Sequence, residues 1–479
     1  MTSPITLPVV TIQSSLQTVI DDVRSGLVLS EDIWLSCYRT GSTSVHGKVS
    51  VSLDNNDRSR VILEARDGVE IQVLGGGQYT AACSALNILH TRVAFPRQTF
   101  TDPDRADPQH PQQISAFDIS PDGTQVATGY NDGAIFLSPV TSVSRSTVSA
   151  DGAKLSCKPH LTTVTSLRFF PSSRVLLSAG ADFGLHILPA EASPAPDATS
   201  ANKEPLPFKP VRSLKGHTRS ITCTAMISRG RNVLSAAKDG TVRLWDVGGG
   251  QQIRAMCSTR YVPVNAMSIG EKATFKVAAT VDPDGENVSG RSTPAALDLR
   301  EVDTADKLAF CALQDGQFEI FDLTSKASVF RSASPADGSA TKSPALSAIC
   351  YSPSANLLAT GSVKGILTIY DTRNLSSALT SFTRNGASIE SLAFVVPSSL
   401  KFLHAHSSDV SAPHDGELGL AIASEDGLPY IAEVRPEGPG VVAELVGSDC
   451  EAIRIVRVCT SDDGGEVWTA GDDGVIRKY

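Results

Sequence analysis

Long apolar segments are missing from this chain of 479 residues, and so are the usual marks of an export signal. No uninterrupted apolar run approaches the roughly 20 residues that a membrane-spanning helix needs. Residues 1–10 contain no basic residue and no long apolar run, both of which a secretory signal peptide requires. We therefore expect neither a signal peptide nor contact with a membrane.

Closely spaced cysteine pairs are missing as well. Nine cysteines are scattered along the chain, none in a Cys-x-x-Cys pair, and several lie in apolar, strand-like patterns. Such a distribution is typical of reduced core residues and not of a disulfide framework or a zinc site. It favours a cytoplasmic or nuclear protein.

Groupings of catalytic residues are not evident. The sequence has no nucleophile elbow and no paired carboxylates in a distinctive setting. Residues 75–77 are three glycines, but the Gly-Lys-Ser/Thr sequence of a phosphate-binding loop does not follow them. We expect a protein that is not an enzyme and that binds no cofactor.

One histidine-rich stretch could suggest a metal site. Its side chains are His404, His406, Asp409, His414 and Asp415. Their spacing fits no standard zinc pattern, and exposed histidines in a flexible loop are the commoner explanation. We expect no metal.

The composition is that of an ordinary soluble protein, with 41% apolar and 19% charged residues. The net charge is -9 and the isoelectric point is about 5.5. This balance disfavours nonspecific binding of nucleic acid and favours a basic protein partner. The length allows a large repeat domain and one added domain.

Residues 215–246 have a recognisable internal plan. A Gly-His pair is followed by an alternating run, a second apolar run, a tight turn at 238–240 and a third run that ends in Trp-Asp. Three short strands closed by Trp-Asp are typical of one blade of a WD-repeat β-propeller. His217, Ser235, Asp239 and Trp245 can satisfy one another in one buried chain of hydrogen bonds. We interpret these four residues as a structural tetrad and not as a catalytic triad.

The same plan recurs along the chain. Its copies begin near residues 114, 164, 216, 264, 346, 389 and 453. Such short strands bury their faces only when blades stack, and a closed ring leaves only short edges exposed. The sequence predicts an all-β fold, a seven-bladed WD-repeat β-propeller with a small N-terminal β-rich module. The third copy alone has the complete polar tetrad, so we expect hydrogen bonds to hold this blade most firmly.

Residues 1–78 do not fit the repeat and predict the N-terminal β-rich module. Residues 60–65 and 69–74 flank an Asp-Gly pair, which favours a β-hairpin. The propeller is assigned to residues 79–479. The last repeat stops after its third strand, so its outer strand must come from elsewhere, and we expect it from about residues 79–95. Stretches rich in small and polar residues predict projecting loops at 190–207, 282–299, 332–344 and 404–417.

Acidic side chains gather in the sixth and seventh repeats. They occupy positions that face one rim of a propeller, next to the turn Asp or at the entrance to the first strand: Glu390, Glu425, Asp426, Asp449, Glu451 and Asp472. Such a sector would steer a lysine-rich partner helix and set its register. The alternative is that these residues are solvated loop charges.

Two stretches resemble the proteasomal ATPase-associated factor family. One is 216–246, with Arg-Gly-Arg-Asn at 229–232, and the other is Trp-Leu-Ser-Cys-Tyr at 34–38 followed by Ser-Val-His-Gly-Lys-Val at 44–49. The resemblance extends to the layout of nearly the whole chain, although the long loops depart from the compact family pattern. It implies a non-enzymatic assembly chaperone of the proteasome regulatory particle. Such a chaperone binds the C-terminal domain of one ATPase subunit of the base and hinders premature docking onto the core particle.

A second hypothesis is an adaptor or scaffold of another complex, such as a substrate receptor of a ubiquitin ligase. Such a receptor should carry a helical adaptor-binding motif, whereas residues 1–80 have the pattern of β-strands. In either case we expect the free chain to be a monomer.

Overall fold

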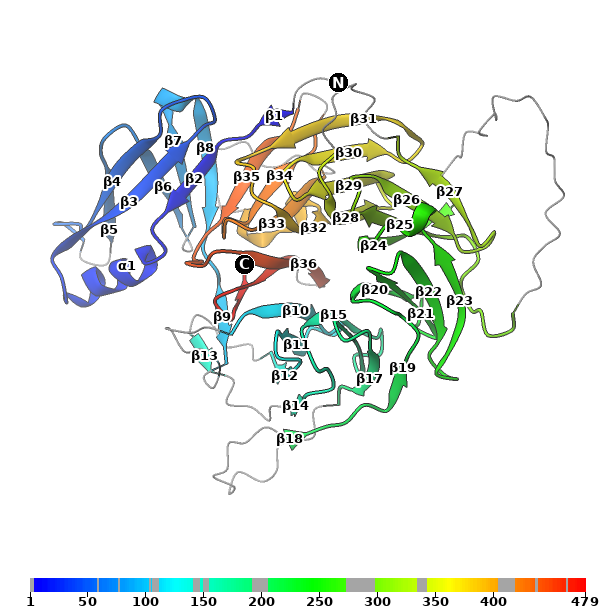
Figure 1. The fold of residues 1–479 in the computed structure, drawn as a ribbon. Helices are drawn as coiled ribbons and strands as arrows, with labels where there is room; N and C mark the ends of the chain where they lie inside the picture. Colours follow the sequence, from blue (N-terminus) through cyan, green and yellow to red (C-terminus); the bar gives the residue numbers. More distant parts are fainter. Residues whose placement is uncertain are drawn as a thin grey trace.

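The structure is a computed structural model that describes residues 4–57, 60–75, 78–102, 105, 112–140, 147–149, 155–191, 206–272, 298–333, 343–403, 418–435, 438–461 and 464–479. Figure 1 shows a ring of sheets with a smaller module at one side. Nearly all elements of the described residues are β-strands. Short 3₁₀ helices lie at Ser84–Leu86, Thr259–Tyr261, Pro397–Ser399 and Lys401–Leu403.

The smaller module begins with an antiparallel sheet that packs against a helix. The sheet has the order β2-β3-β4-β5. Its strands are β2 (Val9–Ile12), β3 (Ser30–Tyr38), β4 (Val45–Leu53) and β5 (Val61–Ala65). Helix α1 (Leu16–Ser25) buries Leu16, Val19, Ile20 and Val23, whose spacing places them on one face. Gly26 ends the helix with a φ of 77°, which glycine adopts without strain.

Three further strands of the module extend a sheet of the ring. Strands β6 (Glu70–Gly75), β7 (Gln78–Cys83) and β8 (Ile88–Ala94) pair in antiparallel fashion. Strand β8 then pairs in parallel with β35 (Gly440–Leu445), the outermost strand of one ring sheet. Side chains of β7 and β8 share a hydrophobic core with α1, β3 and β4. The module therefore continues past residue 78, where the sequence suggested its boundary.

The hairpin predicted for residues 60–74 does not form. Strand β5 pairs with β4 and β6 pairs with β7, and no pairing joins β5 to β6 in the described residues. The turn between them folds onto β4 instead, where Gly47 leaves room for Val69; a Cβ at Gly47 would lie 2.2 Å from a Val69 methyl group. Because Val69 is buried there, β6 leaves the turn on a different path from β5.

The ring consists of seven sheets in the described residues, each antiparallel in its four main strands. The first three are β10 (Ile114–Ile119), β11 (Gln125–Tyr130), β12 (Ile135–Pro139) and β14 (Leu155–Cys157); β15 (Val164–Phe169), β16 (Val175–Gly180), β17 (Leu185–Pro189) and β19 (Arg212–Leu214); and β20 (Ile221–Ile227), β21 (Asn232–Ala237), β22 (Thr241–Asp246) and β23 (Gln251–Cys257).

The next three sheets are β24 (Val264–Glu271), β25 (Lys307–Leu313), β26 (Phe318–Asp322) and β27 (Ala327–Arg331); β28 (Leu346–Ser352), β29 (Leu357–Ser362), β30 (Leu367–Asp371) and β31 (Asn374–Thr383); and β32 (Ile389–Val395), β33 (Gly419–Ser424), β34 (Tyr430–Glu433) and β35. The last contains β36 (Ile453–Ser461), β37 (Gly464–Gly471) and β38 (Val475–Lys478). Short strands β1 (Ile5–Thr6), β13 (Thr147–Ser149) and β18 (Leu206–Pro207) add parallel pairs to the outside.

The ring is closed by contacts between neighbouring sheets. The innermost strands β10, β15, β20, β24, β28, β32 and β36 each contact the next, and β36 contacts β10. Hydrophobic clusters fill the spaces between adjacent sheets; one of them joins Ala127 and Leu137 of the first sheet to Leu167 and Leu176 of the second. The all-β propeller fold that the repeats predict is therefore confirmed.

The strand that completes the last sheet was expected from about residues 79–95, and this expectation is wrong. The strand is β9 (Gln98–Thr101), which pairs in antiparallel fashion with β38. Residues 79–95 instead form most of β7 and β8 of the smaller module. Phe100 accounts for the pairing of β9 with β38, because its side chain is buried and its ring stacks on Trp468 at a centroid distance of 5.6 Å.

A buried ion pair joins the smaller module to the ring. Arg384, which is 4% exposed, pairs with Glu444, which is 2% exposed. Arg384 also donates to the Pro8 carbonyl at 3.1 Å, and Glu444 accepts from the Val10 amide at 3.1 Å. Because the same two charges also hold backbone groups of the N-terminal segment, they fix that segment against the fifth and sixth sheets.

The predicted projecting loops fall mostly outside the described residues. This holds for 192–205, 282–297, 334–342 and the whole of 404–417, which contains His404, His406, Asp409, His414 and Asp415.

Candidate interaction surface on the ring

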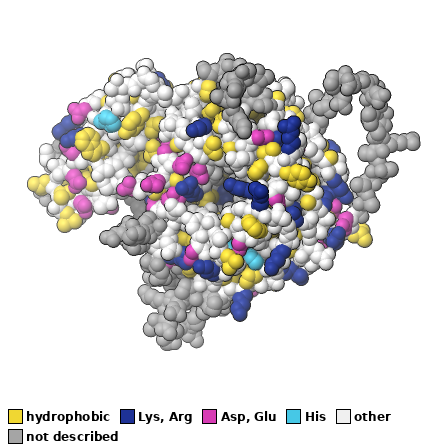
Figure 2. All heavy atoms as spheres, in the orientation of Figure 1, with side chains coloured by type: hydrophobic (Ala, Val, Ile, Leu, Met, Phe, Trp, Pro, Cys, Tyr) yellow, Lys and Arg dark blue, Asp and Glu magenta, His cyan; other side chains and the backbone are white. Residues whose placement is uncertain are grey.

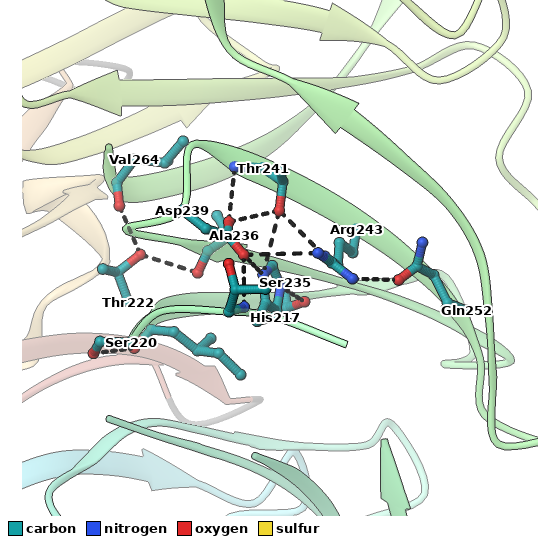
Figure 3. Close-up of polar contacts among 12 residues, drawn as sticks. His217, Ser220, Thr222, Ser235, Ala236, Asp239, Thr241, Arg243, Gln252 and Val264 are labelled. Carbon is teal, nitrogen blue, oxygen red and sulfur yellow. Dashed lines mark hydrogen bonds and ion pairs between the residues drawn. The ribbon is translucent and has the colours of Figure 1, made fainter. Parts of the chain in front are cut away.

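The predicted tetrad forms one directional chain of hydrogen bonds in the third sheet, and Figure 3 labels three of its members, His217, Ser235 and Asp239. Trp245 Nε1 donates to Ser235 Oγ at 2.8 Å, and Ser235 Oγ lies 2.7 Å from His217 Nε2. His217 Nδ1 lies 2.9 Å from Asp239 Oδ2. A carboxylate only accepts, so Nδ1 carries the proton and Nε2 accepts the Ser235 hydroxyl hydrogen. Ser235 is fully buried and committed to two partners, which excludes it as a nucleophile.

Asp239 is the anchor of this chain. Its carboxylate also accepts from the Thr241 hydroxyl at 2.6 Å and from the Thr218 amide at 3.1 Å. Burial raises the pKa of Asp239, but the hydrogen bonds from His217, Thr241 and Thr218 outweigh burial and hold the pKa well below its usual 3.8. The ionised side chain therefore ties the loop that enters the sheet to the β21–β22 turn.

The second sheet contains a partial copy of the tetrad that the sequence analysis missed. His160 Nε2 lies 3.1 Å from Ser178 Oγ, and His160 Nδ1 lies 2.9 Å from Asp182 Oδ1. Leu188 stands in the register position of the tryptophan. The signal was present in the sequence, because His160 precedes Ser178 by 18 residues, the separation also found between the histidine and serine of the third sheet.

A β-bulge follows the first residue of every innermost strand. A β-bulge changes the direction in which the side chain of the extra residue points. In all seven innermost strands the extra residue is polar. The bulged residues are Ser115, Thr165, Thr222, Asn265, Ser347, Glu390 and Arg454.

Several bulged side chains bridge neighbouring sheets. Thr222 donates to the Val264 carbonyl at 2.9 Å, and Asn265 donates to the Leu346 carbonyl at 2.7 Å. Ser347 donates in the same way to the next sheet. These contacts, which join the third, fourth, fifth and sixth sheets, form a polar seam along the innermost strands.

Two predicted rim acids belong to this seam. Arg454 holds Asp472 through two hydrogen bonds of 2.8 and 2.7 Å and reaches Glu390 at 3.3 Å. Asp472 is buried. Glu390 and Asp472 thus share the single positive charge of Arg454, and these ion pairs bridge the sixth and seventh sheets where other sheets use neutral side chains.

A third rim acid, Asp426, stabilises its own turn. Its carboxylate accepts from Ser424 Oγ at 2.6 Å and from the Leu428 amide at 3.1 Å, and Asn385 Nδ2 donates to its other oxygen. We infer that its contribution is to the shape of the rim.

The remaining rim acids, Glu425, Asp449 and Glu451, are exposed. Close packing brings their two loops together, because Ser448 donates to the Gly427 carbonyl at 2.7 Å and a Cβ at Gly427 would lie 2.1 Å from the Cys450 carbonyl oxygen. Among the described residues, no hydrogen bond or ion pair engages these three carboxylates. Figure 2 shows acidic and basic side chains intermingled near the middle of the visible face.

The described residues contain no cluster of metal-ligating side chains. No helix among them is long and apolar enough to cross a membrane. All nine cysteines are free thiols, and Cys37, Cys83, Cys311 and Cys350 are buried, whereas Cys257 is exposed.

Comparison with known proteins identifies the repeats. The family model of the WD domain, G-beta repeat, matches residues 103–137, 153–187 and 208–246. The chain is 26% identical over 286 residues to ribosome biogenesis protein YTM1 of Pyricularia oryzae, which covers 58% of this chain and 51% of that protein. It is 33% identical over 84 residues to a THO complex subunit 6 homolog of Rattus norvegicus, covering 18% of this chain and 20% of the relative.

THO complex subunit 6 of Homo sapiens is 30% identical over 93 residues, covering 19% of this chain and 23% of the relative. The chain spans about half or less of the length of these curated relatives. The chain therefore contains WD repeats within an all-β propeller fold, and such repeats indicate a protein of the scaffold or adaptor type.

Proposed function

We propose that this protein is a non-enzymatic assembly chaperone that holds the C-terminal domain of a proteasome regulatory-particle ATPase subunit against the rim of its ring. The chaperone regulates assembly of the base and its docking onto the core particle. The binding site is inferred from two adjoining loops that present Glu425, Asp449 and Glu451. The carboxylates of these residues have no hydrogen-bond or ion-pair partner among the described residues. The choice of partner rests on the resemblance of residues 34–49 and 216–246 to the proteasomal ATPase-associated factors.

The proposed surface is smaller than the acidic sector expected from the sequence. Glu390 and Asp472 are both paired with Arg454, and Asp426 is held by its own turn. Three uncompensated carboxylates on adjoining loops leave a local negative field in a protein of net charge -9. Such a field attracts a lysine-rich helix and accelerates association most at low salt.

Assembly of ribosomal particles is a second candidate, which the match to the ribosome biogenesis protein over 58% of this chain favours. A ubiquitin-ligase receptor has less support. The described part of the N-terminal module has one α-helix, and α1 turns its apolar face into the module's own core. The nuclear part of the expected location agrees with the relatives, whereas they give the cytoplasmic part no support.

Affinity purification of the tagged full-length chain from its own cells tests the proposal. We expect enrichment of base ATPase subunits without core-particle subunits. Enrichment of ribosome-precursor proteins would instead favour the second candidate, and enrichment of a cullin complex would favour the ligase receptor. Either result, with base subunits at background, would reject the chaperone function.

A further inference from the structure

Two strands of the N-terminal module have an edge that no other strand covers in the described residues. Strand β5 is the last strand of the β2-β3-β4-β5 sheet, and β6 is the last strand of the sheet that runs from β32 through β35 to β8 and β7. The turn at 66–69 connects them, yet they remain unpaired. An uncovered edge presents backbone donors and acceptors that can pair with another chain.

The register shows which groups of β5 are available. The Asp54 amide donates to the Arg60 carbonyl at 2.9 Å, and the Arg66 amide donates to the Lys48 carbonyl at 2.8 Å. In an antiparallel pair, hydrogen-bonded residues alternate with residues whose polar groups point away. The even-numbered residues of β5 therefore bond to β4. The amide and carbonyl groups of Val61, Leu63 and Ala65 point toward the uncovered edge.

A cleft of about 760 Å³ lies between the two edges. Consecutive residues line it on both sides, residues 61–63 of β5 and residues 71–74 of β6, together with Ile20 of α1 and Tyr79 of β7. Side chains of a strand alternate between two faces, so a wall of consecutive residues is a strand edge and not a sheet face. The cleft is thus flanked by two edges and has helix α1 against it.

The side chains of the cleft define its occupant. Val61, Leu63 and Ile71 are half-buried, and Val73 is 55% exposed, so alternate positions of an incoming strand would meet apolar side chains. Arg24 and Arg60 line the cleft with a single acid, Asp57, and Arg24 also lies 3.9 Å from the exposed carboxylate of Asp21, which does not line the cleft. The excess of guanidinium groups is complementary to carboxylates on the occupant.

We propose that an extended segment of a partner protein, in which acidic and apolar residues alternate, binds between β5 and β6 as an added β-strand. Its backbone pairs with both edges, its apolar side chains face the core of the module, and its carboxylates face Arg24 and Arg60. Strand addition of this kind derives affinity from main-chain hydrogen bonds and specificity from alternate side chains. This site is separate from the acidic rim and does not depend on the partner proposed for it.

Strand addition would also have a structural consequence. The bound segment joins the β2–β5 sheet to β6, β7 and β8, and so to the sixth sheet of the ring through β35. One continuous sheet would then run from the module into the ring.

The test uses the full-length protein and a fluorescent, end-capped hexapeptide in which valine alternates with glutamate. We expect saturable binding and protection of β5 and β6 from amide hydrogen exchange. The same peptide N-methylated at alternate residues should bind about tenfold more weakly, because one edge loses its hydrogen bonds. The peptide with lysine in place of glutamate should also bind about tenfold more weakly, because it meets Arg24 and Arg60.

Val61→Pro supplies the matched test on the protein. It removes an amide that points into the cleft and leaves the β4 pairing intact, since proline is tolerated at the first residue of an edge strand. We expect binding about tenfold weaker, with unchanged protection of β4. Val61→Ile keeps the amide and should bind as the parent protein does. Equal affinity of the parent and N-methylated peptides, equal affinity of the two Val61 variants, or self-association of the parent protein through this cleft would overturn the proposal.

Discussion

Ser235 serves two partners at once, accepting from Trp245 and donating to His217. Among the described residues, its equivalent in the second sheet, Ser178, bonds through its side chain to His160 alone, because Leu188 replaces the indole. The chain therefore contains a natural comparison of a complete and an incomplete tetrad. The residue types of the third repeat were sufficient to predict the complete tetrad. His160 does not follow a glycine, so only its separation from Ser178 indicates its role.

The first prediction concerns this comparison. Ser235→Ala leaves two buried polar groups without a partner, and Ser178→Ala leaves one. At about 1–3 kcal/mol for each unsatisfied buried group, Ser235→Ala should lower the free energy of unfolding by more than Ser178→Ala. Denaturant unfolding of both variants measures the difference. Equal losses would show that the indole bond contributes nothing to the third sheet.

The second prediction concerns pH. The pKa of Asp239 is depressed in the folded chain, so its ionised form adds stability above the ordinary value of 3.8. That stability is lost as pH falls through the folded pKa. Between about pH 5 and about pH 2, the free energy of unfolding should fall less steeply for Asp239→Asn than for the parent protein. Asp21→Asn, at an exposed site, is the control and should follow the parent curve. Parallel curves for Asp239→Asn and the parent would contradict the assignment.

At the scale of elements, the alternating patterns located most strands of the ring, because a half-buried strand needs that period. Pairing was harder to predict. The residues of β8 and β9 both suit an outer strand, and what decides between them is distant: β8 meets β35, whereas Phe100 of β9 meets Trp468. The missing hairpin has a similar cause, since Val69 packs against Gly47 of another strand.

The third prediction tests the closing strand. Phe100 is buried and stacks on Trp468, which also contacts Phe117 in the same cluster. Phe100→Ala should lower the free energy of unfolding by about 3–5 kcal/mol, because the aromatic contacts are lost and a cavity remains. Urea unfolding monitored by tryptophan fluorescence measures the loss. Thr99→Ala on the same strand is the control, and equal stability of the two variants would argue against closure through β9.

At the scale of the whole molecule, the repeats predicted the fold class. The places of the acidic residues within the sixth and seventh repeats predicted the acidic sector. Sequence could not separate acids that pair within the protein from acids that have no partner among the described residues. Whether Glu390 meets Arg454 depends on the bulge at each residue and on the neighbouring sheet. The proposed interaction surface is therefore limited to Glu425, Asp449 and Glu451, and the cleft between β5 and β6 is a second proposed surface that no motif indicated.

The most direct test of the proposed chaperone is the affinity for the C-terminal domain of the base ATPase subunit that copurifies with the chain, measured by calorimetry at physiological salt. Glu425→Lys with Glu451→Lys should weaken binding by about tenfold or more and leave the melting temperature unchanged. Glu31→Lys with Asp32→Lys makes the same change of charge on the N-terminal module and should bind as the parent protein does. Equal affinities of the two double variants, or no binding by the parent protein, would contradict the account.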